Sequence, residues 1–404
     1  MTTIIRNMIP RRCGDILRAM RFSRPGLVRS VCIGLAILLI AAFLVTRQSM
    51  ADRAVQDFKE SIARDTSFQG QWAAYTNLLS AVGPGLAQDT LAATMPANPR
   101  SHMLNHESGK YLYAKEGIAG IYDCKNDFNG SCFHGFISDF LSDRGLGALD
   151  QIIQLCRAGR PLDQARECSH GVGHAFLILA GYAHLPDAVK KCRTEFATST
   201  DGIGDCDDGV FMENNFGEFS TPPADRWYKA SDPLYPCDAP GISGDTVAHN
   251  SCWFMQSQAT LNANMYPQFR GDVKSVSTYC ATLSDLADKR TCVEGLARQI
   301  QAQAGSDTGT IESVCRDAFT ADPQQCYSDA AESAYAFGAE STGVQLCASS
   351  GTHTSECYQA LFDRISSTAY RTLPDRLAAC GRIPDASVAA TCTAYIRAHT
   401  DTSK

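Results

Sequence analysis

Apolar residues recur at three- and four-residue intervals along most of the chain after residue 100, which is the spacing of one helical face. The run "LGALDQIIQLC" ends at Cys156, and a second apolar run, "CSHGVGHAFLILAG", begins at Cys168. The same order returns where "LPDAVKKC" ends at Cys192 and "CDDGVFMENNF" begins at Cys206. Alternating β-branched runs are almost absent. The pattern therefore predicts pairs of helices joined by short polar loops, with hardly any strands.

Cysteines mark the ends of these helices. Of the 18 cysteines, 16 follow residue 100 and fall into eight neighbouring couples: Cys124/Cys132, Cys156/Cys168, Cys192/Cys206, Cys237/Cys252, Cys280/Cys292, Cys315/Cys326, Cys347/Cys357 and Cys380/Cys392. The second members recur at intervals of 31 to 46 residues, the period of helical-hairpin repeats. Connectivity does not follow from sequence, but pairing within each couple is the simplest hypothesis. No C-x-x-C motif occurs, which favours structural disulfides over metal thiolates.

The predicted fold is accordingly an all-α, solenoid-like array of disulfide-stapled helical hairpins that follows an N-terminal transmembrane helix. Its general form resembles tetratricopeptide-type and Sel1-type solenoids, whose signature residues are absent. Five segments are expected: a cytoplasmic basic segment (1–29), a transmembrane signal anchor (30–46), a helical membrane-proximal segment (52–100), histidine-rich repeats (101–260) and C-terminal repeats (261–404).

The expected membrane segment begins with "SVCIGLAILLIAAFLV", Ser30 to Val45, and seven arginines precede it. This asymmetry places the N-terminus in the cytoplasm and the main part of the chain outside it, in the periplasm of a bacterium. A signal peptide cleaved after Ser49–Ala51, followed by secretion, is the alternative. Either route brings the cysteines into an oxidising compartment.

Export gives the part of the chain after residue 47 a different charge from the whole. Residues 1–47 hold eight of the 36 basic residues but only one of the 43 acidic residues, so the remainder carries a formal charge of −14. That charge argues against a nucleic-acid partner and is compatible with cations.

Histidines occupy matching places in successive repeats. The repeats "CFHG", "CSHG" and "CDDG" set His134, His170 and Asp208 at the same position, and equivalent positions of stacked hairpins lie side by side. Two H-x-x-x-H pairs, His102/His106 and His170/His174, each place two imidazoles on one helical face. The glycine that follows each repeat position leaves room for a neighbouring backbone or a ligand.

Imidazoles and carboxylates are the usual ligands of zinc, iron or copper. The candidate ligands are His134, His170, His174 and Glu213, with His102, His106 and Asp208 as further members. Glu213 is also the candidate catalytic base for a metal-bound water. A hydrogen-bond network of the same histidines is the structural alternative.

The sequence thus predicts an exported, membrane-anchored metal-binding protein and is compatible with a metalloenzyme. The alternative is a non-catalytic helical-repeat scaffold that binds a protein partner on its surface. The irregular segment 220–250, with Trp227, Tyr228 and Tyr235, is expected either to cover the metal site or to pack on the surface as a repeat insertion.

Overall fold

A computed structural model describes residues 46, 48–95, 99–125, 127–128, 130–157, 162–197, 200–217, 224–305, 307–336, 340–367 and 372–400. The chain divides into two compact units, Met1–Gly83 and Pro84–Lys404, and this division falls within the predicted segment 52–100. In the first unit, residues 48–64 are helical, and α3 (Phe68–Val82) follows them. The buried rings of Phe58 and Tyr75 lie 5.9 Å apart and join these two helices.

The predicted transmembrane segment, 30–46, lies outside the described residues except for Thr46. Among the helices that the structure describes, none is both long enough and apolar enough to cross a bilayer.

The described part of the second unit is helical and contains no strand, as the hydrophobic pattern predicts. Its first half comprises α4 (Pro84–Thr94), α5 (Pro99–Glu116), α6 (Ser131–Arg144), α7 (Leu149–Arg157), α8 (Leu162–Ala180), α9 (Leu185–Glu195), α10 (Thr200–Asn215) and α11 (Thr246–Thr260). Its second half comprises α12 (Val273–Thr282), α13 (Leu286–Ala304), α14 (Thr308–Ala318), α15 (Pro323–Ala336), α16 (Glu340–Ser349), α17 (Thr354–Ser367), α18 (Leu373–Gly381) and α19 (Ala386–Thr400).

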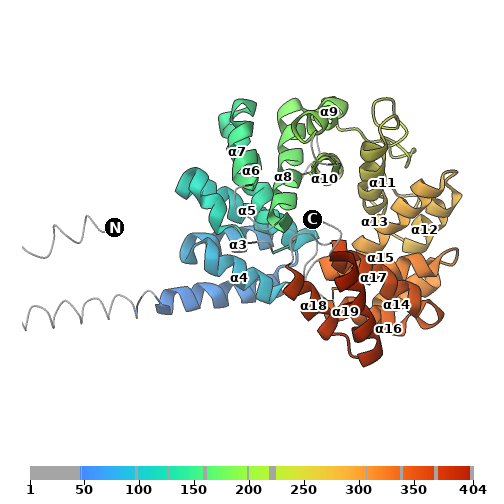
Figure 1. Cartoon of the computed structure of the whole chain (residues 1–404). Coiled ribbons are helices and arrows are strands. Elements are labelled where there is room, and N and C mark those ends of the chain that lie inside the picture. Colours follow the sequence, from blue (N-terminus) through green and yellow to red (C-terminus); the bar gives the residue numbers. More distant parts are fainter. Residues whose placement is uncertain are drawn as a thin grey trace, which may run out of the picture. The chain divides into compact units, whose positions relative to one another are not determined.

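One set of helices forms a continuous row. Each of α5, α6, α8, α10, α11, α13, α15, α17 and α19 packs against the next, and Figure 1 shows this succession from teal to red. The shorter helices α7, α9, α12, α14, α16 and α18 each pack on the row helix that follows them in the chain. This confirms the prediction of a helical-hairpin array.

Aspartate side chains set the starts of several later helices. Asp245, Asp272, Asp285 and Asp307 precede α11 to α14, and each side chain accepts hydrogen bonds from backbone N–H groups of the first turn. Such caps satisfy donors that have no partner inside the helix. Local sequence therefore determines where these helices begin.

The disulfides follow the predicted couples. Within the described residues, seven couples are bonded, with Cα–Cα distances from 5.2 to 5.7 Å: Cys124–Cys132, Cys192–Cys206, Cys237–Cys252, Cys280–Cys292, Cys315–Cys326, Cys347–Cys357 and Cys380–Cys392. Cys168 is also disulfide-bonded, while the side chain of Cys156 lies outside what the structure describes. Cys124 caps the C-terminus of the 3₁₀ helix Gly117–Asp123, which follows α5. The couple Cys237–Cys252 differs from the expected helix-to-helix form, because Cys237 lies in the irregular segment before α11.

Glycines bring the first row helices unusually close together. A Cβ atom on Gly135 of α6 would lie 2.0 Å from the carbonyl oxygen of His106 on α5. A Cβ atom on Gly209 of α10 would likewise lie 2.0 Å from the carbonyl oxygen of His170 on α8. The glycines therefore admit a neighbouring backbone, one of the two uses that the sequence predicts for them.

Candidate metal centre

Five histidines from three neighbouring row helices meet in the interior of the second unit. α5 supplies His102 and His106, α6 supplies His134, and α8 supplies His170 and His174. All five are buried, with exposed fractions between 1% and 9%. The rings of His134 and His170 are stacked with centroids 4.6 Å apart, so equivalent repeat positions do lie side by side as predicted.

The donor atoms form two groups of three that share His134. In each group, the ligand atoms all lie within 4.8 Å of one another: His102, His106 and His134 in the first, and His134, His170 and His174 in the second. In the first group, Nε2 of His102 lies 3.1 Å from Nε2 of His106 and 3.4 Å from Nδ1 of His134. Nitrogen donors on one tetrahedral ion at 2.0–2.1 Å lie roughly 3.3–3.4 Å apart, so these separations suit a shared cation.

Backbone and side-chain acceptors determine which nitrogen of two rings faces the cluster. Nδ1 of His102 donates to the carbonyl oxygen of Phe128 at 2.8 Å, and Nδ1 of His174 donates to Oε2 of Glu213 at 2.8 Å. A neutral imidazole has one N–H, so Nε2 of each ring presents a lone pair. Within the described structure, the buried Nε2 atoms of His170 and His174 have no hydrogen-bond partner.

His134 lies between two acceptors. Its Nδ1 faces Nε2 of His102, and its Nε2 lies 3.3 Å from Oε2 of Glu167. A neutral ring donates to only one of them, and burial, followed by the neighbouring histidines, lowers the pKa of His134 well below its usual value. Burial lowers the pKa values of His102 and His170 in the same way. These three rings are thus neutral nitrogen donors, and His134 has one proton for two acceptor contacts, a shortage that a metal cation would relieve.

Glu213, from α10, lies behind His174. Its carboxylate is completely buried, and the hydroxyl of Tyr182 donates to its second oxygen. Both oxygens thus accept hydrogen bonds within the protein, and Glu213 stands outside the two groups of candidate ligands. A carboxylate that accepts from the outer nitrogen of a metal-binding histidine orients the ring and raises its basicity.

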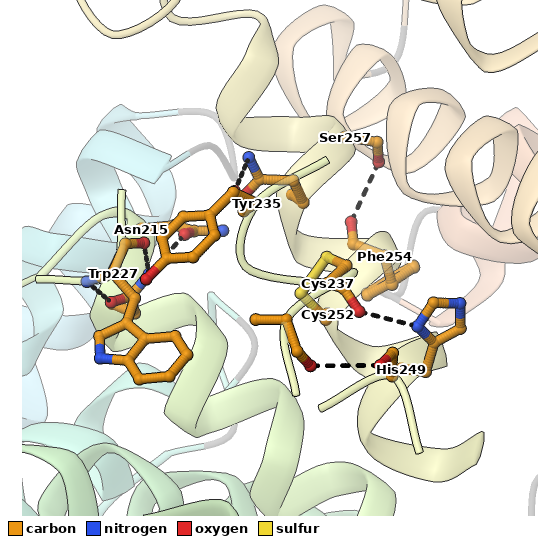
Figure 2. Close-up of a disulfide and its surroundings, with 12 residues drawn as sticks. Asn215, Trp227, Tyr235, Cys237, His249, Cys252, Phe254 and Ser257 are labelled. Atoms are coloured by element: carbon orange, nitrogen blue, oxygen red, sulfur yellow. Dashed lines mark hydrogen bonds between the residues drawn. A yellow bond between two sulfur atoms is a disulfide. The ribbon is translucent and has the colours of Figure 1, made fainter. Parts of the chain in front are cut away.

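The irregular segment before α11 contacts the residues next to Tyr182 and Glu213. The indole nitrogen of Trp227 donates to the carbonyl oxygen of Ala183, next to Tyr182, and the Asn214 side chain, next to Glu213, bonds the backbone of Trp227. Figure 2 shows the stacked rings of Trp227 and Tyr235 on one side of the Cys237–Cys252 disulfide and His249 on the other. The described part of this segment therefore braces the residues that hold Glu213.

Asp208 is also outside the two histidine groups. It is partly buried, and its carboxyl shares a hydrogen bond with Ser251 of α11. Desolvation, with a smaller contribution from Asp205, raises the pKa of Asp208 to about 8. The carboxyl is therefore mainly protonated at neutral pH and pairs with α11.

Sequence reasoning did not identify Glu167 and Tyr182. Glu167 directly precedes Cys168 and lies three residues before His170, so i,i+3 spacing on α8 was a usable signal for it. Tyr182 lies in the short 3₁₀ helix Tyr182–His184 after α8, where no sequence pattern marks it.

Comparison with known proteins identifies no relative, since no family model, no curated protein and no solved structure matches this chain.

Proposed function

We propose that this chain is an extracytoplasmic metal-binding protein whose five buried histidines hold a divalent or redox metal ion: zinc, iron or copper. The observation that carries this proposal is the meeting of buried imidazoles from α5, α6 and α8, with donor separations that suit a cation. Neutral nitrogen donors favour these three metals over magnesium or calcium, which prefer oxygen ligands.

In this proposal Glu213 is a positioning residue. Its carboxylate holds the Nδ1 proton of His174, so Nε2 of that ring stays available to the metal. Tyr182 occupies the other oxygen of Glu213, an arrangement that favours support of a ligand over proton transfer to a substrate.

We place the second unit outside the cytoplasm, with residues 30–46 as its membrane anchor. The disulfides support this location, because such bonds persist in oxidising compartments. Intact-mass measurement of the chain recovered from its host tests the anchor. A chain that retains residues 1–51 supports it, and a chain that begins after Ala51 identifies a cleaved signal peptide instead.

Metal analysis of the purified full chain tests the central proposal. We expect stoichiometric zinc, iron or copper in the wild type and a clear loss in His170→Ala. His184→Ala is the matched control, since the side chain of His184 is exposed and its ring pairs with Asp187 at the surface. A wild-type chain without bound metal, even after dialysis against each ion, would contradict the proposal and favour a scaffold that binds a protein partner.

A further inference from the structure

We propose that the histidine cluster holds two metal ions, and that the ring of His134 bridges them through its two nitrogens. The first ion would be bound by His102, His106 and Nδ1 of His134. The second would be bound by His170, His174 and Nε2 of His134, with Glu167 as a further donor. This inference rests on the proposed metal-binding function and adds the number of ions and the role of each ring.

The division of the donors supports two ions. Two nitrogens on one ion lie no farther apart than about 4.2 Å, twice the usual metal–nitrogen distance. The five rings do not form one group even within 4.8 Å; they separate into two groups of three. One ion therefore cannot bind all five without a rearrangement of the close-packed row helices.

The contacts of His134 support the bridge. Its Nδ1 points to the first group, where Nε2 of His102 is 3.4 Å away. Its Nε2 lies beside Oε2 of Glu167, which precedes His170 on the same helix, α8. Because both neighbours of this ring are acceptors, a cation on each nitrogen suits the geometry better than one shared proton.

Bridging has a defined proton balance. When both nitrogens of His134 bind metal, the ring gives up its single N–H proton to solvent and becomes an anionic imidazolate. That negative charge lies between the two cations and reduces their repulsion.

The two positions differ in their electrostatic surroundings. The second group has two nearby carboxylates, Glu167 at His134 and Glu213 at His174. In the first group, the neutral carbonyl of Phe128 orients the ring of His102. We therefore expect the second position to fill first and to bind at least tenfold more tightly.

Zinc titration of the metal-depleted full chain, with a chromophoric chelator as competitor, tests the inference. Two ions per wild-type chain, bound in separate steps, are expected. His106→Ala is expected to keep the tight step and lose the weak one, and His170→Ala is expected to lose the tight step. His184→Ala serves as the control that binds two. One ion in the wild type would overturn the bridge and leave the proposed function intact, whereas no zinc, iron or copper in any titration would overturn both.

The bridge itself has a spectroscopic readout. After loading with two copper(II) ions, an imidazolate between them couples the two electron spins, and the electron paramagnetic resonance signal at low temperature is reduced. In His134→Asn, which offers no ring with two nitrogens, any copper that remains is expected to give an uncoupled signal. Two uncoupled copper ions in the wild type would exclude the bridge. Circular dichroism of each variant confirms that the helices are retained.

Discussion

Burial determines the chemistry available to the histidine side chains. His134 is 1% exposed, while the side chain of His184 is 61% exposed and lies beside Asp187. A buried imidazole resists protonation and keeps its lone pair, and a buried lone pair without a donor costs about 1–3 kcal/mol. Metal coordination offsets this cost, which is why burial supports the metal interpretation of these residues.

Glu213→Gln tests the support of His174. The amide keeps the shape of the carboxylate but weakens the acceptor, so the orientation and basicity of His174 both suffer. We expect metal affinity to fall about 10- to 100-fold, the usual effect of changing such a partner. Chelator competition measures it. Asp187→Asn, which alters an exposed carboxylate–histidine pair, should leave affinity unchanged, and an unchanged affinity in Glu213→Gln would refute the positioning role.

Asp208 makes stability depend on pH. The pKa of Asp208 in the folded state, about 8, is above the ordinary value of 3.8. Between about pH 4 and pH 8 the folded state therefore keeps this carboxyl protonated, while the unfolded state releases the proton. The stability that this group contributes is complete below about pH 4 and is lost as pH rises through 8. We expect the free energy of unfolding to fall less between pH 5 and pH 8 in Asp208→Asn than in the wild type.

Urea unfolding at several pH values measures this difference. Asp317→Asn is the control: Asp317 is exposed, and its contacts with Arg316 and, to a smaller extent, Ser313 lower its pKa, so it stays ionised across this range. Equal slopes in Asp208→Asn and the wild type would show that the pKa of Asp208 is not raised.

At the scale of helices, glycines determine how closely neighbours approach. Gly173 and Gly209 lie where α8 and α10 touch, and a Cβ atom on either would lie 2.0 Å from a carbonyl oxygen of the other helix. Gly173 directly precedes His174, and Gly209 lies against the backbone of His170. The spacing of the helices and the geometry of the candidate site therefore depend on the same residues.

Gly209→Ala is expected to separate α8 from α10. The added methyl group meets backbone, which cannot turn away as a side chain can, so the free energy of unfolding should fall by about 1–3 kcal/mol. Metal affinity should fall as well, because Glu213 moves with α10. Gly147→Ala, where a Cβ atom meets nothing within 4 Å, is the control. Denaturation and chelator competition measure both effects; wild-type values for Gly209→Ala would disprove the close contact.

At the scale of the whole molecule, the second unit behaves as a row of stapled hairpins. Each row helix packs on its neighbours, and each described staple closes a loop with a sequence separation of 8 to 15 residues. In such arrays stability is approximately a sum of local terms and nearest-neighbour interfaces. The effect on metal affinity of removing a disulfide should therefore depend on how far that disulfide lies from the candidate metal centre.

Paired alanine substitutions test this expectation. Replacing Cys380 and Cys392 should destabilise the C-terminal hairpin by about 3 kcal/mol and leave metal affinity unchanged. Replacing Cys192 and Cys206 should cost a similar amount and also weaken metal binding, because this staple holds α10, which carries Glu213. Proteolysis and metal titration measure the two effects, and equal loss of metal in both variants would contradict independent repeats.

Sequence alone predicts much of this architecture. The helical spacing of apolar residues predicts the helices, and the regular cysteine couples predict the seven described disulfides. The repeat position of His134 and His170 also predicts that these rings lie side by side. Glu213 and Asp208 were harder to place, since both share α10 and lie five residues apart, on different parts of its surface.

What the amino-acid sequence determined by itself is local: helix periodicity, helix starts and short disulfide loops depend on residues close together along the chain. What only the tertiary structure decided is which faces meet. It brought His102 and His106 to the other three rings, placed Glu213 behind His174, and set Glu167 beside His134. The physical reason is that the rotation of each helix about its axis follows from contacts such as Gly135 against His106, and these join residues from different helices.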